Sequence, residues 1–88
     1  MNLKKLRGKI DALDSKIIEL FNERANVAKE IGAIKKRANA QVYAPDREKK
    51  VYERVSAKNK GPLSDKCLFA VYRELMAGSL MLEKPLKV

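Results

Sequence analysis

One arginine interrupts the most regular apolar pattern in this sequence. Between Leu3 and Ile34, positions at alternating spacings of three and four residues are all apolar except Arg24. A helix with this pattern would place the Arg24 guanidinium on its apolar face, where an unpaired charge is strongly unfavourable. The charge needs an internal carboxylate partner, a route to solvent or an anionic ligand. Arg24 is therefore the first candidate for binding an anionic ligand.

Polar side chains also interrupt the apolar faces of two later segments. Glu48 stands three residues before Val51 in a second helical pattern, and Ser79 and Glu83 are four residues apart in a third. Polar groups on three helices predict either one shared polar pocket or a structural network of ion pairs between Arg24 and Glu48 or Glu83. The periodicity favours neither interpretation over the other.

Two further cations, Arg7 and Lys35, flank the first pattern on the same side. They share one heptad position with Asp14, Phe21 and Ala28. Arg7 and Lys35 are 28 residues apart, which is about 42 Å along a continuous helix. They cannot reach one small ligand from one chain, so Arg7 in a shared site must come from an antiparallel partner chain. The alternative for Arg7 is an ordinary solvated charge.

Three helices would position these residues. The first pattern predicts one helix over about residues 3–38, about 54 Å long, because this stretch has no proline and only two glycines, and the periodicity breaks at NAQVYA, residues 39–44. A second helix is expected to begin at Pro45 and to end in KNKGPLSD, and a third to begin after the N-cap Ser64 and to end at Pro85. The predicted fold class is all-α, with residues 1–88 as a single domain.

The first predicted helix is too long for the rest of the chain to cover. The two later helices are short, and the 3-4 spacing of the apolar positions is typical of a coiled-coil seam. We therefore expect an oligomer that covers the seam.

Composition narrows the class of partner. The formal net charge is +9, with 20 Lys and Arg against 11 Asp and Glu, which favours nucleic acid, a membrane surface or a small acidic molecule. The chain has no histidine, and its single cysteine, Cys67, falls in an apolar helical segment. We interpret Cys67 as a core residue rather than a nucleophile or metal ligand, and expect no metal. With no signal peptide and no apolar segment long enough to span a membrane, a cytoplasmic location is expected.

Four stretches taken together resemble the all-helical chorismate mutases: LRGKID, NERANVAKEIGAIK, PDREKKVYERV and GSLMLEKPL. The resemblance covers about residues 3–86. It implies an intertwined antiparallel homodimer of three-helix chains, whose two sites each take residues from both chains. It also implies an isomerase of the shikimate pathway that converts chorismate to prephenate for phenylalanine and tyrosine biosynthesis. This intramolecular step uses no cofactor, because the site acts by holding the reactive conformer and stabilising developing charge.

The resemblance assigns the cations as follows. Arg24 would hold one carboxylate of chorismate from within the chain, and Arg7 of the other chain would hold the second. Lys35 would bridge a carboxylate and the ether oxygen.

The remaining roles fall on the second and third helices. Glu48 would accept a hydrogen bond from the ring hydroxyl, with Arg47 as a supporting charge. Ser79 would lie near the ring carboxylate, and Glu83, where family members carry Gln or Glu, would face the ether oxygen. Ala44 stands where members often have Asp, so any side-chain contact made by that Asp would be missing.

Two other functions fit parts of the pattern. An isochorismate pyruvate lyase of the same fold would use the same carboxylate-binding cations. A basic helical module that binds nucleic acid or a partner helix would explain the net charge and the run Lys35–Arg37, although such modules carry their cations on solvent faces. The ending LEKPLKV resembles the junction at which bifunctional members continue into prephenate dehydratase, so a free-standing mutase and an excised domain both fit.

Overall fold

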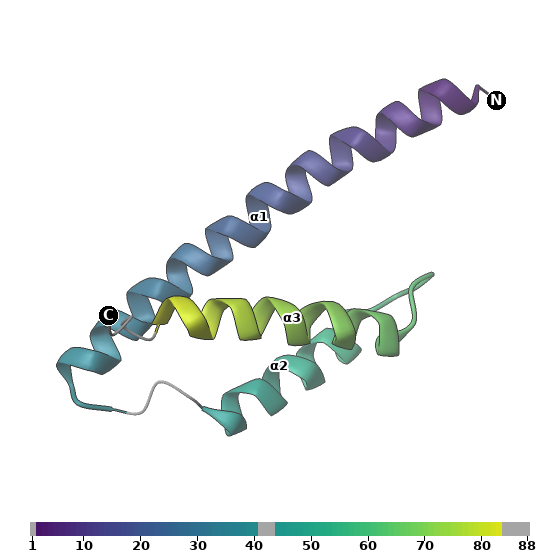
Figure 1. The fold of residues 1–88 in the computed structure, drawn as a ribbon. Coiled ribbons are helices and arrows are strands. Elements are labelled where there is room, and N and C mark those ends of the chain that lie inside the picture. The colour runs from purple at the N-terminus through teal and green to yellow at the C-terminus, as the bar shows by residue number, and fades with distance from the viewer. Residues whose placement is uncertain (1, 41–43, 84–88) are drawn as a thin grey trace.

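A computed structural model describes residues 2–40 and 44–83. These residues form three helices, α1 (Leu3–Arg37), α2 (Pro45–Lys58) and α3 (Asp65–Glu83), and contain no strand (Figure 1). The molecule is elongated, with principal extents of 56 × 28 × 18 Å. The prediction of an all-α chain with one very long first helix is confirmed. Pro85, expected to end the third helix, lies outside the described residues.

Local sequence signals define both ends of α1. The Asn2 side chain accepts a hydrogen bond of 2.9 Å from the Lys4 backbone N–H, as an N-cap does. At the other end Asn39 has a φ of 57°, a left-handed conformation that asparagine tolerates better than most residues. The Ala40 N–H then donates to the Lys35 carbonyl at 2.8 Å, which closes the helix.

A hydrogen-bonded turn joins α2 to α3. The Asn59 side-chain amide donates to the Leu63 carbonyl at 2.9 Å and to the Asp65 carboxylate at 2.7 Å. The Ser56 hydroxyl donates to the other Asp65 oxygen at 2.7 Å. The hydrogen bond from Asn59, followed by that from Ser56, lowers the pKa of Asp65 below its ordinary value.

The first turn of α3 is capped as the sequence predicts. The Cys67 backbone N–H donates to the Ser64 hydroxyl oxygen at 3.1 Å, so Ser64 is the N-cap. The Cys67 side chain, however, is exposed, and the expectation that it lies in the core is wrong for the single chain. It lies beside, rather than on, the less exposed face of α3 that carries Leu68 and Tyr72.

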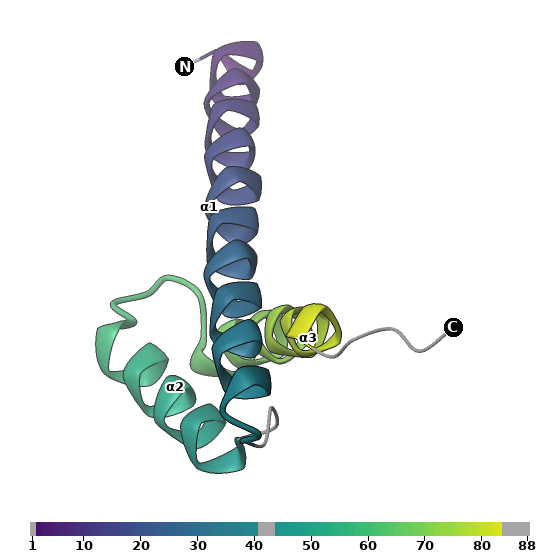
Figure 2. The same cartoon turned by 90° about the vertical axis from the view of Figure 1, so that its left-hand side faces the viewer.

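The third helix packs against both of the others. The backbone of α3 approaches both α1 and α2, whereas the described parts of α1 and α2 do not approach each other closely. Both views show α3 beside the carboxyl-terminal half of α1 (Figures 1 and 2), and in Figure 1 α3 is drawn between α1 and α2. Tyr52 of α2 and Phe69 of α3 meet edge to face, with ring centroids 5.3 Å apart. The amino-terminal half of α1 extends away from the rest of the chain.

The single chain has little apolar core. Among the described residues no hydrophobic side chain is buried. The seam of α1 has nine apolar positions, and all are exposed: Leu3, Leu6, Ile10, Leu13, Ile17, Leu20, Val27, Ile31 and Ile34. Leu20, for example, is 61% exposed. Of the helices in the described part of the chain, none has an apolar stretch that could cross a membrane.

Candidate functional site

Six of the seven predicted site residues line one cavity, which we call the three-helix pocket. Its volume is about 360 Å³, and it lies among the carboxyl-terminal half of α1, the first turns of α2 and the end of α3. The six residues are Arg24, Lys35, Arg47, Glu48, Ser79 and Glu83. Of the two interpretations left open by the periodicity, the structure favours a shared polar pocket.

Arg24 lies at the wall of this pocket and is half-buried. Its guanidinium carbon is 5.7 Å from the centroid of the Tyr72 ring, within reach of a cation–π interaction. In the described part of the chain no ion pair joins Arg24 to Glu48 or Glu83. The aromatic face therefore offsets part of the cost of the cation, and the guanidinium donors remain available to an anion.

Tyr72 is one of the residues that sequence reasoning missed as a partner of the site. The signal was its position seven residues before Ser79, which puts the two on one face of the helix two turns apart.

Glu83 packs directly against a glycine of α1, and this close contact sets its position. Gly32 is the one buried residue of α1, and a Cβ built on it would lie 2.7 Å from the Cβ of Glu83 and 2.8 Å from its Cα. Real Cβ atoms essentially never come that close, so a side chain at position 32 would force α3 away from α1. Sequence reasoning missed Gly32 too, although a glycine inside a strong helical pattern is itself a signal of close packing.

Ser79 is the most buried of the predicted site residues, at 6% exposure. Its hydroxyl donates to the Leu75 carbonyl at 2.8 Å, one turn earlier in α3. In this orientation the oxygen can accept a hydrogen bond from a ligand. To donate to a carboxylate, the hydroxyl has to rotate away from Leu75.

The amino terminus of α2 brings Arg47 and Glu48 to the pocket. Their backbone N–H groups each donate to the Ala44 carbonyl at 3.1 Å. Ala44 occupies the N-cap position and makes no side-chain cap hydrogen bond. The helix begins instead with Pro45 and with Asp46 and Glu48 in its first turn, which suit the positive end of the helix dipole.

Arg7, the seventh predicted residue, lies elsewhere. It is exposed in the amino-terminal half of α1 and stands 17 positions before Arg24, which is about 26 Å along the helix. The single chain therefore does not bring Arg7 to the pocket, and its contribution from a second chain stays a prediction.

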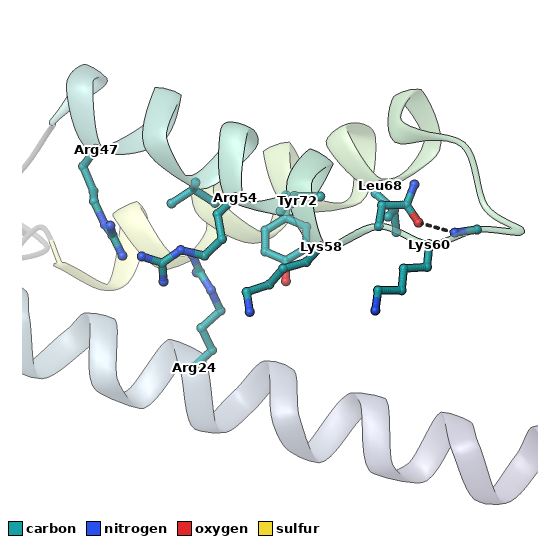
Figure 3. Close-up of a pocket in the computed structure, with 11 residues that line it drawn as sticks. Arg24, Arg47, Arg54, Lys58, Lys60, Leu68 and Tyr72 are labelled. Atoms are coloured by element: carbon teal, nitrogen blue, oxygen red, sulfur yellow. Dashed lines mark hydrogen bonds between the residues drawn. The ribbon is translucent and has the colours of Figure 1, made fainter.

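A second cavity adjoins the first, and we call it the cation pocket. It has a volume of about 610 Å³ and shares Arg24, Arg47 and Val51 with the three-helix pocket. Its other cations are Arg54, Lys58 and Lys60. Figure 3 shows the Arg24, Arg47 and Arg54 side chains directed into the space between α1 and α2. Sequence reasoning missed this cluster, although Arg47, Arg54 and Lys58 follow one another at helical spacings of seven and four.

Comparisons with known proteins agree with this geometry. The family model described as chorismate mutase type II matches residues 6–84. The bifunctional chorismate mutase/prephenate dehydratase of Aquifex aeolicus is 42% identical over 90 residues, which are 98% of this chain and 25% of that protein. The chorismate mutase of Methanocaldococcus jannaschii is 40% identical over 53 residues, 60% of this chain and 54% of that protein. The chain thus spans about a quarter of the bifunctional relative and about half of the archaeal mutase.

Solved structures give the same result. Form II of the chorismate mutase from Thermus thermophilus superposes with a TM-score of 0.89 at 30% identity and covers 92% of both chains. The Helicobacter pylori chorismate mutase, solved in complex with prephenate, has a TM-score of 0.84 at 31% identity and covers 92% of this chain and 88% of that one.

Proposed function

Because this chain belongs to the chorismate mutase type II family, we propose that it catalyses the rearrangement of chorismate to prephenate in the biosynthesis of phenylalanine and tyrosine. The observation that carries the proposal is the three-helix pocket, where Arg24, Lys35 and Glu83 come together from distant parts of the sequence. The matched residues correspond to the mutase rather than the dehydratase named in the bifunctional relatives.

The charge of the pocket suits a substrate with two carboxylates. Arg24, Lys35 and Arg47 supply three positive charges and Glu48 supplies one negative charge, while Glu83 adds none when it acts as a hydrogen-bond donor. The sum is then +2 from one chain. Arg7 of a partner would raise it to +3, an excess of positive charge that attracts a dianion.

The proposed mechanism leaves the protein chemically unchanged. One C–O bond of the substrate breaks while a C–C bond forms within the same molecule, so no atom passes to or from a side chain. Arg24, half-buried against the Tyr72 ring, would bind one carboxylate and hold the compact conformer. Lys35 and a protonated Glu83 would donate to the ether oxygen as it gains negative charge.

Glu48 and Ser79 would orient the ring in the same pocket. The Glu48 carboxylate can only accept hydrogen bonds when ionised, which suits the substrate hydroxyl. The Ser79 oxygen lies near the end of α3 that holds Glu83, and its orientation toward Leu75 leaves it able to accept, or to donate after rotation, at the ring carboxylate. Arg47 adds positive charge at the mouth.

The active form that we propose is an antiparallel homodimer in which the long helices cross. The exposed apolar seam of α1 supports it, because nine large side chains in one stripe are not left in water by a stable monomer. Crossing the helices would also carry Arg7 of each chain toward the pocket of the other. The proposal includes a cytoplasmic location, where Cys67 would stay reduced.

One assay tests the function. Purified chain is mixed with chorismate, and the loss of its absorbance is followed, with isochorismate in a parallel reaction. We expect rapid conversion of chorismate to prephenate and slow or no release of pyruvate from isochorismate. Faster pyruvate release would favour the lyase instead. A chain that is helical and dimeric but turns over neither substrate, and that binds DNA with strong salt dependence, would overturn the proposal in favour of a nucleic-acid module.

A further inference from the structure

The cation pocket is a cluster of positive charge without a counter-charge in the described structure. Five cations line it, Arg24, Arg47, Arg54, Lys58 and Lys60, and no carboxylate is among its lining residues. Figure 3 shows the Arg24, Arg47 and Arg54 side chains directed into the space between α1 and α2. In the single chain Arg47, Arg54, Lys58 and Lys60 are exposed, so water screens the repulsion between their charges. A second chain that covered this space would strengthen that repulsion unless it brought an anion with it.

The long helix of a second copy carries a carboxylate at the right position. Asp14 is exposed and stands seven residues after Arg7 at the same heptad position. The other acidic residues in the amino-terminal half of α1, such as Asp11 and Glu19, fall at outer heptad positions that point away from the seam. Asp14 therefore lies on the same side of α1 as Arg7, and in an antiparallel pairing both side chains would face the second chain.

The register of such a pairing brings Asp14 to the cation pocket. If Arg7 of one chain enters the three-helix pocket of the other, Asp14 follows about 10 Å along the same helix. In an antiparallel crossing, this step leads toward the amino terminus of the receiving α1. There the wall of the three-helix pocket ends at Arg24, and the cation pocket begins on its other side.

We propose that the carboxylate of the second copy's Asp14 enters the cation pocket and pairs with Arg54, with Lys58 beside it. The occupant of this pocket is thus the partner's α1, and the ion pair fixes the register that delivers the partner's Arg7 to the substrate. In this role Arg54 is a positioning residue. The inference rests on the proposed dimeric mutase.

Charge reversal tests the pairing directly. Asp14→Arg, Arg54→Asp and the double variant are each measured for the dimer dissociation constant, by sedimentation equilibrium, and for kcat/KM with chorismate. We expect each single variant to weaken the dimer and to lower kcat/KM by about tenfold or more, and the double variant to recover most of both, because the ion pair re-forms in the opposite sense. Asp11→Arg on the outer face of α1 and Lys50→Asp on α2, which line neither pocket, should behave like the wild type.

A second, more conservative pair of substitutions provides a test that does not depend on the charge-reversal variants folding. In a double-mutant cycle with Asp14→Asn and Arg54→Gln, checked by circular dichroism, the double variant should lose no more than the worse single variant. Additive losses in this cycle, or no recovery in the charge-swapped protein, would overturn the inference. So would inorganic phosphate that binds at Arg54 in a dimer insensitive to Asp14, since the occupant would then be a free anion.

The outcome separates this inference from the proposed function. If the double charge-reversal variant recovers dimerisation but the wild type does not turn over chorismate, the ion pair is supported and the mutase function is refuted. If the wild type turns over chorismate but the double variant recovers neither dimerisation nor activity, the mutase function is supported and the ion pair is refuted. A monomeric wild type would overturn the ion pair.

Discussion

Gly32 of α1 lies against Glu83 of α3 so closely that no side chain fits between them. A Cβ at position 32 would be 2.7 Å from the Cβ of Glu83. The contact places the base of the Glu83 side chain at the three-helix pocket and fixes where α3 crosses α1. Backbone as well as side-chain atoms of Glu83 take part, so a flexible side chain cannot simply move aside.

We expect Gly32→Ala to displace α3 and to lower both stability and turnover. Overpacking of this kind costs about 1–3 kcal/mol of unfolding free energy, and the shift of Glu83 should lower kcat/KM. Gly8→Ala is the matched control in the same helix, because nothing lies within 4 Å of a Cβ there; it should be neutral or stabilise by up to about 1 kcal/mol. Chemical denaturation and the chorismate assay measure both effects. Equal behaviour of the two variants would refute the role of the close contact.

Arg24→Ala should nearly abolish turnover while the protein stays helical. Loss of a charged contact to a substrate carboxylate costs on the order of 3 kcal/mol in kcat/KM. Arg24→Lys should recover little, because a lysine cannot make the two parallel hydrogen bonds of a guanidinium. Arg37→Ala, an exposed position on the same helix, is the control. Near-normal turnover of Arg24→Ala would mean that the cation serves only its contact with Tyr72.

Arg7 should act across the dimer. Arg7→Ala and Arg24→Ala homodimers are each expected to be almost inactive. After subunit exchange, half of the dimers combine the two variants, and one of their two sites has both arginines, so roughly a quarter of all sites should recover. Mass spectrometry confirms the exchange. If mixed dimers form and activity stays absent, the two arginines do not share a site.

In the proposed mechanism Glu83 assists the ether oxygen as a hydrogen-bond donor. Glu83→Gln, a permanent donor of similar shape, should therefore keep most of the turnover, whereas Glu83→Ala should lower kcat/KM by about a hundredfold. The chorismate assay measures both variants, with Glu74→Ala, an exposed position of α3, as the control. Near-normal turnover of Glu83→Ala would remove Glu83 from the catalytic residues.

The turn between α2 and α3 should make stability depend on acid pH. Hydrogen bonds from Asn59 and Ser56 lower the pKa of Asp65 below 3.8 in the folded state, so the ionised carboxylate contributes stability above that value. The contribution is lost as the pH falls through the lowered pKa. The wild type should be more stable than Asp65→Asn at about pH 6, and the gap should narrow toward about pH 2.

Urea unfolding at fixed protein concentration measures this gap at each pH. Asn59→Ala removes the larger of the two hydrogen-bond effects and should reduce the pH dependence of the gap. A gap that is constant with pH would show that the Asp65 charge does not stabilise the turn.

Periodicity was sufficient to predict the helices and to identify which polar residues face inward. Arg24 stood out because a seam of apolar residues has a strict spacing, and the same reasoning grouped Glu48, Ser79 and Glu83. A pattern within one helix cannot say which turn of α3 crosses α1, because that depends on shape complementarity between distant residues. The role of Gly32, the Tyr72 ring over Arg24 and the exposure of Cys67 all depend on that crossing.

If the exposed seam of α1 is covered by a second chain, as we propose, the fraction of folded protein depends on protein concentration. A chain with no buried apolar side chain in its described part gains too little from its own contacts to offset the entropy of ordering three helices. In the proposed dimer, association would supply the missing free energy, so that folding would be a second-order process. Each tenfold dilution removes about 1.4 kcal/mol from the free energy of such a dimer. The cellular abundance of the polypeptide would thus set the fraction of it that is folded, and with it the catalytic capacity per molecule.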